Sequence, residues 1–126
     1  MSKHKPGWKK RPEEGDYTAS RNYLSLQFTT ATAKRLVKQA RQGSQIEHVA
    51  KDILRASCLP LLPSNELHVA DNLRKIRKGK PLSPIILIQG DMTKMRPFVI
   101  ADGYHRLCAA CYADEDAPVA AIMVVF

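Results

Sequence analysis

A short segment near the end of the chain holds the residues best suited to binding an anion. An apolar run over residues 98–101 stops there, and helix-favouring residues follow. The residues at the junction are Asp102, Gly103, Tyr104, His105 and Arg106. The pattern predicts a strand-to-helix turn in which the aspartate is the N-cap and the glycine allows a tight turn. Free amides, the positive end of the helix dipole and a guanidinium together favour a phosphate.

The same residues also fit a purely structural role. A capped helix can carry a histidine and an arginine that only bind nearby carboxylates or carbonyls. Asn65 and His68, at the start of another predicted helix, are weaker ligand candidates, because a histidine at that position is commonly exposed without a function. From the residue types alone, both interpretations stay open.

The cysteines do not predict a metal centre. The chain has three of them, Cys58, Cys108 and Cys111, and no apolar signal-peptide core precedes them. An odd number of cysteines in such a chain favours free thiols in the reducing cytoplasm. Cys108 and Cys111 form a CxxC, but no second pair completes a zinc site. We therefore expect no metal site, and we expect these two residues to be packed inside a helix.

The basic residues form two clusters. The chain has a net charge of +8 and a pI near 9.6. One cluster lies in an N-terminal arm and contains Lys9, Lys10 and Arg11. The other includes Arg74, Lys75, Arg77, Lys78 and Lys80. DNA or RNA, or nucleotide phosphates, would suit both clusters. A disordered tail and lysines placed at a helix C-terminus explain them equally well.

Hydrophobic periodicity and turn residues predict the order of the elements. We expect a flexible basic arm over 1–16 and a helical extension over 17–58, with helices at 19–28 and 31–42. Thr29 and Thr30 are the expected caps of the second helix, Gly43 ends it, and Gly79 ends the later helix that stops near Lys78. A capping box at 44–47 predicts a third helix in that extension. Another helix starts at Ser64 or Asn65 and ends near Lys78. Strands are expected at 84–88, 97–101 and 117–126, with a helix at 103–113 between the last two.

These elements predict an α+β fold, in which helices pack on a small mixed β-sheet and an N-terminal helical extension precedes it. No apolar stretch approaches the roughly 20 residues that a transmembrane helix needs. We therefore expect a cytoplasmic protein that does not bind a membrane. The sequence does not predict an oligomeric state.

Two motifs in the second half resemble the ParB/sulfiredoxin-like superfamily. They are LSPIIL at 82–87 and FVIADGYHRLCAA at 98–110, and they are similar to that family's pattern of two strands followed by Asp-Gly-x-His-Arg. The resemblance implies a ParB/sulfiredoxin-like domain over 59–126. It also implies that Gly103 to Arg106 contact the phosphates of a nucleoside triphosphate bound with Mg²⁺, with Asp102 capping the helix or helping to hold the metal.

The resemblance has one informative departure. Sulfiredoxins need a cysteine where this chain has Tyr104, and a phenol cannot replace a thiolate nucleophile. The sequence therefore predicts a protein that binds a nucleotide or phosphate ligand, with NTP hydrolysis or phosphoryl transfer left open. Two alternatives remain. The first is an accessory protein that binds nucleic acid, with nuclease-like activity left open. The second is a non-catalytic protein-interaction module.

Overall fold

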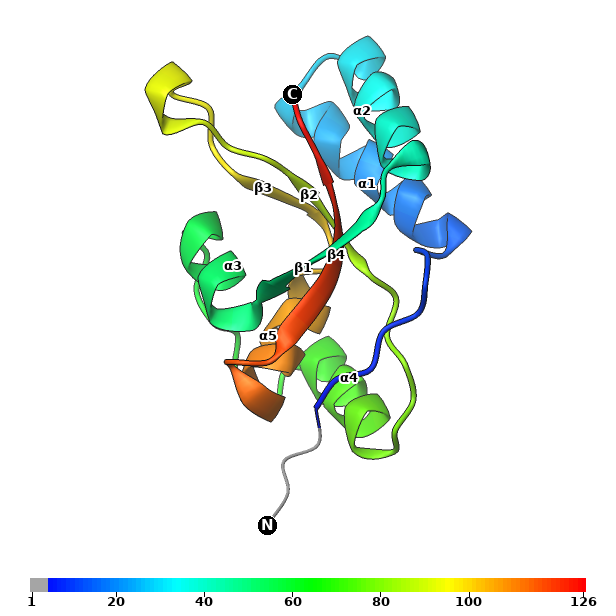
Figure 1. The fold of residues 1–126 in the computed structure, drawn as a ribbon, viewed down its shortest axis with the longest axis vertical. Helices are drawn as coiled ribbons and strands as arrows, with labels where there is room; N and C mark the ends of the chain where they lie inside the picture. Colours follow the sequence, from blue (N-terminus) through cyan, green and yellow to red (C-terminus); the bar gives the residue numbers. More distant parts are fainter. Residues whose placement is uncertain (1–4) are drawn as a thin grey trace.

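The computed structural model describes residues 5–126, and these form an α+β fold (Figure 1). The helices and strands, in chain order, are α1 (Glu14–Gln27), α2 (Thr30–Gln42), β1 (Gln45–Val49), α3 (Ala50–Ser57), α4 (Leu67–Arg77), β2 (Ile85–Ile88), the 3-10 turn η1 (Met92–Lys94), β3 (Val99–Asp102), α5 (Tyr104–Asp114) and β4 (Pro118–Val124). The predicted fold class is confirmed. Residues 1–4 of the predicted arm lie outside the described residues.

The four strands form one mixed sheet in the order β1-β4-β2-β3. The central pair, β2 and β4, is parallel, while β1 pairs with β4 and β3 pairs with β2 in the antiparallel direction. All four residues of β2 are buried, as expected for a central strand whose branched apolar residues lack alternation.

Helices cover both faces of the sheet (Figure 1). Side chains of α1 and α2 pack with Ile86, Ile88 and Ile122 on one face. On the other face α3 and α5 pack with Ile85, Leu87 and Ala121. Helix α4 lies outside α5 and shares a further core cluster with it. The alternation along β2 therefore places α5 and α1 on opposite sides of the same strand.

The predicted helix at the capping box is wrong in its first part. Residues Gln45–Val49 form edge strand β1, and only Ala50–Ser57 is helical. Five residues of β1 pair with β4, from Gln45 opposite Ile122 to Val49 opposite Pro118. This pairing, which a local pattern cannot show, outweighs the helical signal. The predicted extension thus contributes a strand to the same sheet as the residues after 59.

The N-terminal segment is not a free arm from residue 7 onward. Trp8 forms a parallel bridge with Leu82, in which Lys9 donates its N–H to the Leu82 carbonyl at 2.8 Å. Helix α1 begins at Glu14, five positions before the predicted start at Ala19. The prediction of flexibility was wrong because the segment's partner, residue 82, lies far along the chain.

Several predicted boundaries are confirmed. Thr29 caps α2 by accepting the Thr32 N–H at 3.2 Å, and Gly43 follows the helix. Gly79 follows α4 with a φ of +73°. The cap of α4 was predicted at Ser64 or Asn65, but it is Glu66. Among residues 5–126, no helix combines the length and apolarity required to cross a bilayer.

Arg11 provides a test of this N-terminal packing. Its guanidinium donates to three carbonyls at the C-terminus of α2: Gly43 at 2.5 Å, Arg41 at 2.6 Å and Ala40 at 3.3 Å. The last carbonyls of a helix have few partners within it, and here only the Ala40 carbonyl is shown accepting a backbone N–H, that of Gly43 at 3.2 Å. We expect Arg11→Ala to lower the free energy of unfolding by about 1 to 3 kcal/mol, measured by urea denaturation. Lys10→Ala, an exposed neighbour, is the control and should change it by less than about 0.5 kcal/mol.

Candidate functional site

The predicted strand-to-helix turn exists, but its cap differs from the prediction. Strand β3 ends at Asp102, and Gly103 is the N-cap of α5 with a φ of +109°. Asp102 was expected to cap this helix, and that expectation is wrong. Its carboxylate instead accepts a hydrogen bond from Arg106 Nη2 at 2.9 Å. Because the cap residue is a glycine, no cap side chain occupies the first-turn amides of α5.

Gly103 is required by packing as well as by its backbone conformation. A Cβ at this position would lie 2.3 Å from Ile85 Cγ2 and 3.0 Å from Arg106 Nη2. The absent side chain therefore makes room for the first residue of β2. This packing role adds to the expected one, in which the glycine allows the tight turn that its positive φ provides.

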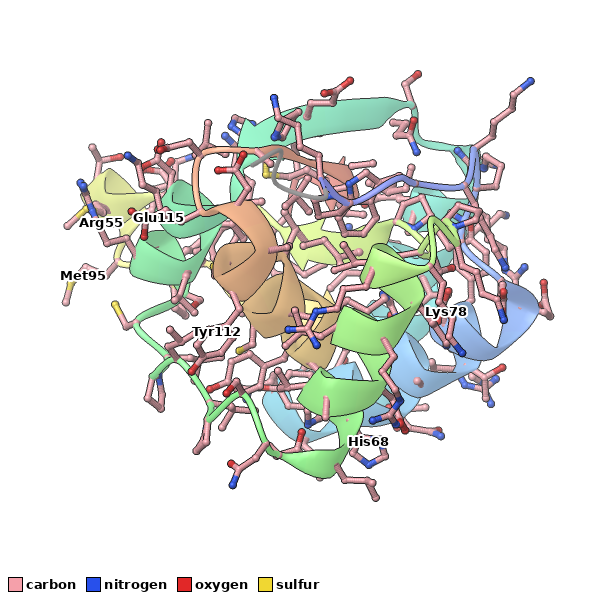
Figure 2. All side chains as sticks on the ribbon, turned by 90° about the horizontal axis from the view of Figure 1, so that it is seen from below. Arg55, His68, Lys78, Met95, Tyr112 and Glu115 are labelled. Carbon is pink, nitrogen blue, oxygen red and sulfur yellow. The ribbon has the colours of Figure 1, made fainter. Side chains whose placement is uncertain are left out.

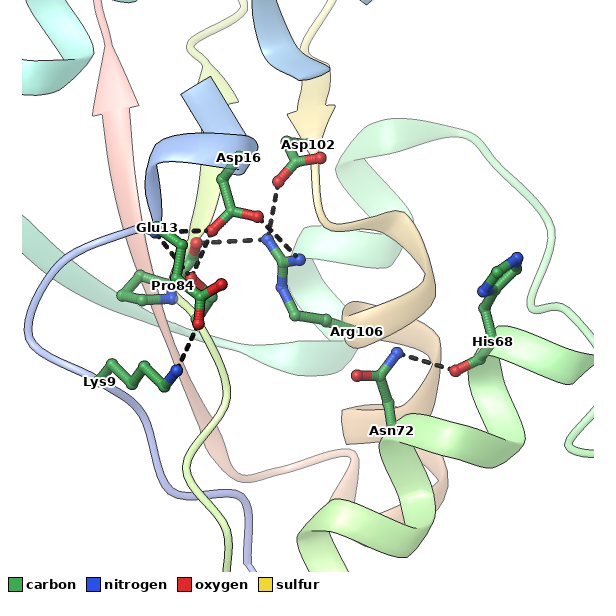
Figure 3. Close-up of polar contacts among 9 residues, drawn as sticks. Lys9, Glu13, Asp16, His68, Asn72, Pro84, Asp102 and Arg106 are labelled. Atoms are coloured by element: carbon green, nitrogen blue, oxygen red, sulfur yellow. Dashed lines mark hydrogen bonds and ion pairs between the residues drawn. The ribbon is translucent and has the colours of Figure 1, made fainter. Parts of the chain in front are cut away.

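Arg106 is held inside the protein by groups from three other parts of the chain (Figure 3). Besides Asp102, its guanidinium donates to Asp16 Oδ1 at 3.5 Å and to the Pro84 carbonyl at 3.4 Å. The side chain is only 16% exposed. In this arrangement the guanidinium links α1, β3 and α5 and faces the interior. It therefore organises the site instead of presenting its charge at the surface.

Two carboxylates share this one cation, and their pKa values move in opposite directions. Burial raises the pKa of Asp102 to about 6, although the Arg106 charge and hydrogen bond oppose this shift. Asp16 is also partly buried, but its hydrogen bond from Ser83 and the Arg106 charge bring its pKa below the usual value. Asp16 therefore stays ionised, while Asp102 gains a proton at mildly acidic pH.

The outer side of the same turn brings two predicted ligand residues together. The rings of His105, in the first turn of α5, and His68, in the first turn of α4, lie 5.0 Å apart between centroids. Glu66 lies beside them, 3.9 Å from His105 Nε2. The Tyr104 hydroxyl donates to the Pro60 carbonyl and so fixes the connector that precedes α4. Asn65 is exposed and adjoins Glu66.

Glu66 belongs to this site, although it was not among the predicted ligand-binding residues. Its carboxylate accepts the His68 and Val69 N–H groups at 3.0 and 2.9 Å, which caps α4. Its pKa lies below the usual value, mainly because of the Val69 hydrogen bond. The prediction of a cap at the neighbouring Asn65 was one residue away. Asp16 had no such signal, because it lies 90 positions from Arg106 along the chain.

The structure divides the predicted nucleic-acid-binding residues into two groups. Lys9 pairs with Glu13, Arg74 with Asp71, and Arg11 binds the end of α2. The others are exposed and form no ion pair with a described residue: Lys10, Lys75, Arg77, Lys78 and Lys80. The Trp8–Leu82 bridge brings the N-terminal cluster next to the second one.

Other parts of the described chain show no metal centre. No group of three or more His, Cys, Asp or Glu residues within 5–126 is arranged to hold a metal ion. The cysteines are free, and burial raises the pKa of the Cys111 thiol to about 11, which makes it unreactive. A cavity of about 520 Å³ lies apart from the turn, between α3 and the β2–β3 connection, and its lining is mainly apolar.

Comparison with known proteins found no matching family model, no matching curated protein and no matching solved structure. The resemblance to the ParB/sulfiredoxin-like superfamily therefore stays a prediction from the two motifs.

The raised pKa of Asp102 predicts a pH-dependent stability. The folded state holds this proton more tightly than the unfolded chain, where the pKa is near 3.8. The free energy of unfolding contributed by Asp102 therefore falls as the pH rises from about 4 to 6. Relative to Asp102→Asn, we expect the wild type to lose about 1 to 3 kcal/mol between pH 4 and 7, measured by urea denaturation. The assignment would be contradicted if the stability of the wild type, relative to that of Asp102→Asn, stayed constant or increased between pH 4 and 7.

Gly103 and Gly79 are a matched pair of positions for testing how tightly Gly103 packs against Ile85. Both have a positive φ, but nothing lies within 4 Å of a Cβ at Gly79. Gly79→Ala should cost about 1 to 2 kcal/mol from backbone strain alone. Gly103→Ala adds the overlap with Ile85 and should cost about 2 to 5 kcal/mol in total. Thermal unfolding of both variants measures the difference. Equal losses would show that Ile85 moves away freely.

Proposed function

We propose that this protein binds a phosphate-bearing ligand, a nucleotide, where the N-terminus of α5 meets the N-terminus of α4. The observation that carries the proposal is the 5.0 Å approach of His105 and His68 beside an α5 first turn that has no side-chain cap. Amide donors at a helix N-terminus and imidazole donors at its side are groups that bind phosphate oxygens.

In this proposal the ligand contacts come from the outer side of the turn. The N–H groups of Tyr104, His105 and Arg106 would bind one phosphate, and His68 and Asn65 would reach further along the ligand. The Arg106 side chain acts as a positioning group, because Asp102 and Asp16 occupy its guanidinium. Gly103 sets the direction in which the amides point.

Glu66 supports a ligand that carries a divalent cation. Its lowered pKa keeps it ionised near both histidines, so it would repel a bare phosphate. Carboxylate and phosphate oxygens are the preferred ligands of Mg²⁺. We therefore propose a magnesium-bound nucleotide, in which Glu66 supplies one carboxylate and the phosphates supply other oxygens.

The site favours binding over turnover. Phosphoryl transfer needs a carboxylate that can accept a proton from the attacking hydroxyl or position a water. Asp102 has a raised pKa, but Arg106 binds its carboxylate on the inner side of the turn. The carboxylate beside His105 is that of Glu66, which accepts two amide hydrogens and has a lowered pKa. A carboxylate in that state is a weak base. The proposal therefore does not include hydrolysis.

The proposal predicts a nucleotide-dependent rise in melting temperature. ATP, CTP, GTP, UTP and pyrophosphate are each added with and without Mg²⁺. A ligand at 100 times its dissociation constant stabilises the folded state by about 2.7 kcal/mol, which raises the melting temperature by several degrees. We expect one nucleotide to do so, more strongly with Mg²⁺, and His105→Ala to weaken its binding tenfold or more in calorimetry.

His48→Ala is the matched control, because His48 is an exposed histidine on β1. It should bind the nucleotide as the wild type does. If no nucleotide or pyrophosphate raises the melting temperature of the folded protein, the proposal is wrong. Equal losses in the His105 and His48 variants would place the ligand elsewhere.

A further inference from the structure

A third concentration of positive charge lies in a groove between α1 and α2. The groove has a volume of about 220 Å³. Four cationic side chains line it: Arg21 from α1, and Lys34, Lys38 and Arg41 from α2. None of these residues belongs to the two basic clusters found in the sequence, because they are scattered among neutral residues along the chain.

Most of this charge is not neutralised within the protein. Arg41 donates to Glu14 at 2.9 Å and lies 4.4 Å from the Tyr17 ring centroid. Arg21, Lys34 and Lys38 have no ion-pair partner among residues 5–126. Like charges around one hollow repel each other. A polyanion that entered the groove would relieve this repulsion and release counterions.

Hydrogen bonds connect the groove to the other basic residues. Arg11 donates to the Arg41 carbonyl at 2.6 Å, which places the N-terminal segment at the end of α2. The same segment then reaches Leu82, next to Lys80 and the C-terminus of α4. Figure 1 shows this segment running from the start of α1 to the side of α4. The basic surface therefore spans three parts of the chain: 21–41, 9–11 and 75–80.

We propose that this basic surface binds double-stranded nucleic acid through its phosphate backbone, with the α1–α2 groove as its centre. Several cations gathered on one surface can contact successive phosphates of a duplex. Such contacts fix the position of a duplex without reading its sequence.

The groove favours a duplex over a single strand. Proteins that bind single strands stack bases on exposed aromatic rings. The aromatic ring in this groove, Tyr17, is 5% exposed and is covered by the Arg41 guanidinium. It therefore cannot stack on a base, and the available contacts are those of cations with phosphates.

This surface is separate from the proposed nucleotide site. His68 and Lys78 lie at opposite ends of α4 (Figure 2), so the nucleotide site is at one end of this helix and the basic surface at the other. The inference does not depend on the nucleotide proposal, and His105→Ala should leave it unaffected.

Fluorescence anisotropy with a labelled 20-bp DNA duplex of arbitrary sequence tests the proposal. The full-length protein should bind it, and the logarithm of the association constant should fall with that of salt concentration with a slope of about −3 or steeper. Lys38→Glu should weaken binding about tenfold. Lys94→Glu changes the net charge equally, but Lys94 lies in η1 and does not line the groove, so this variant should change binding less than about twofold.

Three further probes separate the alternatives. A 20-bp RNA duplex of the same sequence tests whether helical form matters, and binding of either duplex supports the proposal. Tighter binding of the single strand than of either duplex would overturn the preference for a duplex. Binding only to phosphatidylserine vesicles, a slope near zero, or equal losses in the Lys38 and Lys94 variants would overturn the proposal itself.

Discussion

The position of Arg106 between Asp102 and Asp16 is the contact on which the rest of the structure depends. One cation and two carboxylates meet in a largely buried place, so removal of the guanidinium would leave two negative charges without compensation. The three side chains belong to α5, β3 and α1. The cluster therefore ties the helix nearest the N-terminus to the strand-to-helix turn near the C-terminus.

This arrangement changes how the Asp-Gly-x-His-Arg segment must be understood. Its arginine and aspartate neutralise each other and fix the turn, and its glycine accommodates Ile85. What remains for a ligand is the outer side, where His105 meets His68. The motif thus has an inner half that supports the fold and an outer half available for binding. The rotation of about 100° between successive helix residues points His105 and Arg106 in different directions.

The two proposed functions depend on different physical properties of the same fold. The nucleotide site depends on orientation, because a few amides and imidazoles must point at one phosphate. The basic surface depends on the sum of many charges and needs little precision. Helix α4 separates them, with a glutamate cap at its N-terminus and a run of lysines and arginines at its C-terminus, each of which is favoured by the helix dipole.

The sequence by itself determined the elements whose signals are local. The branched run of β2, the Thr29 cap and Gly79 each carry their structure in adjacent residues. The tertiary structure alone decided the rest. Pairing with β4 made a strand of residues 45–49, the bridge to Leu82 ordered Trp8, and Asp16 reached Arg106 across 90 positions. Such contacts depend on which distant residues meet when both faces of the sheet are covered, and no local pattern contains that information.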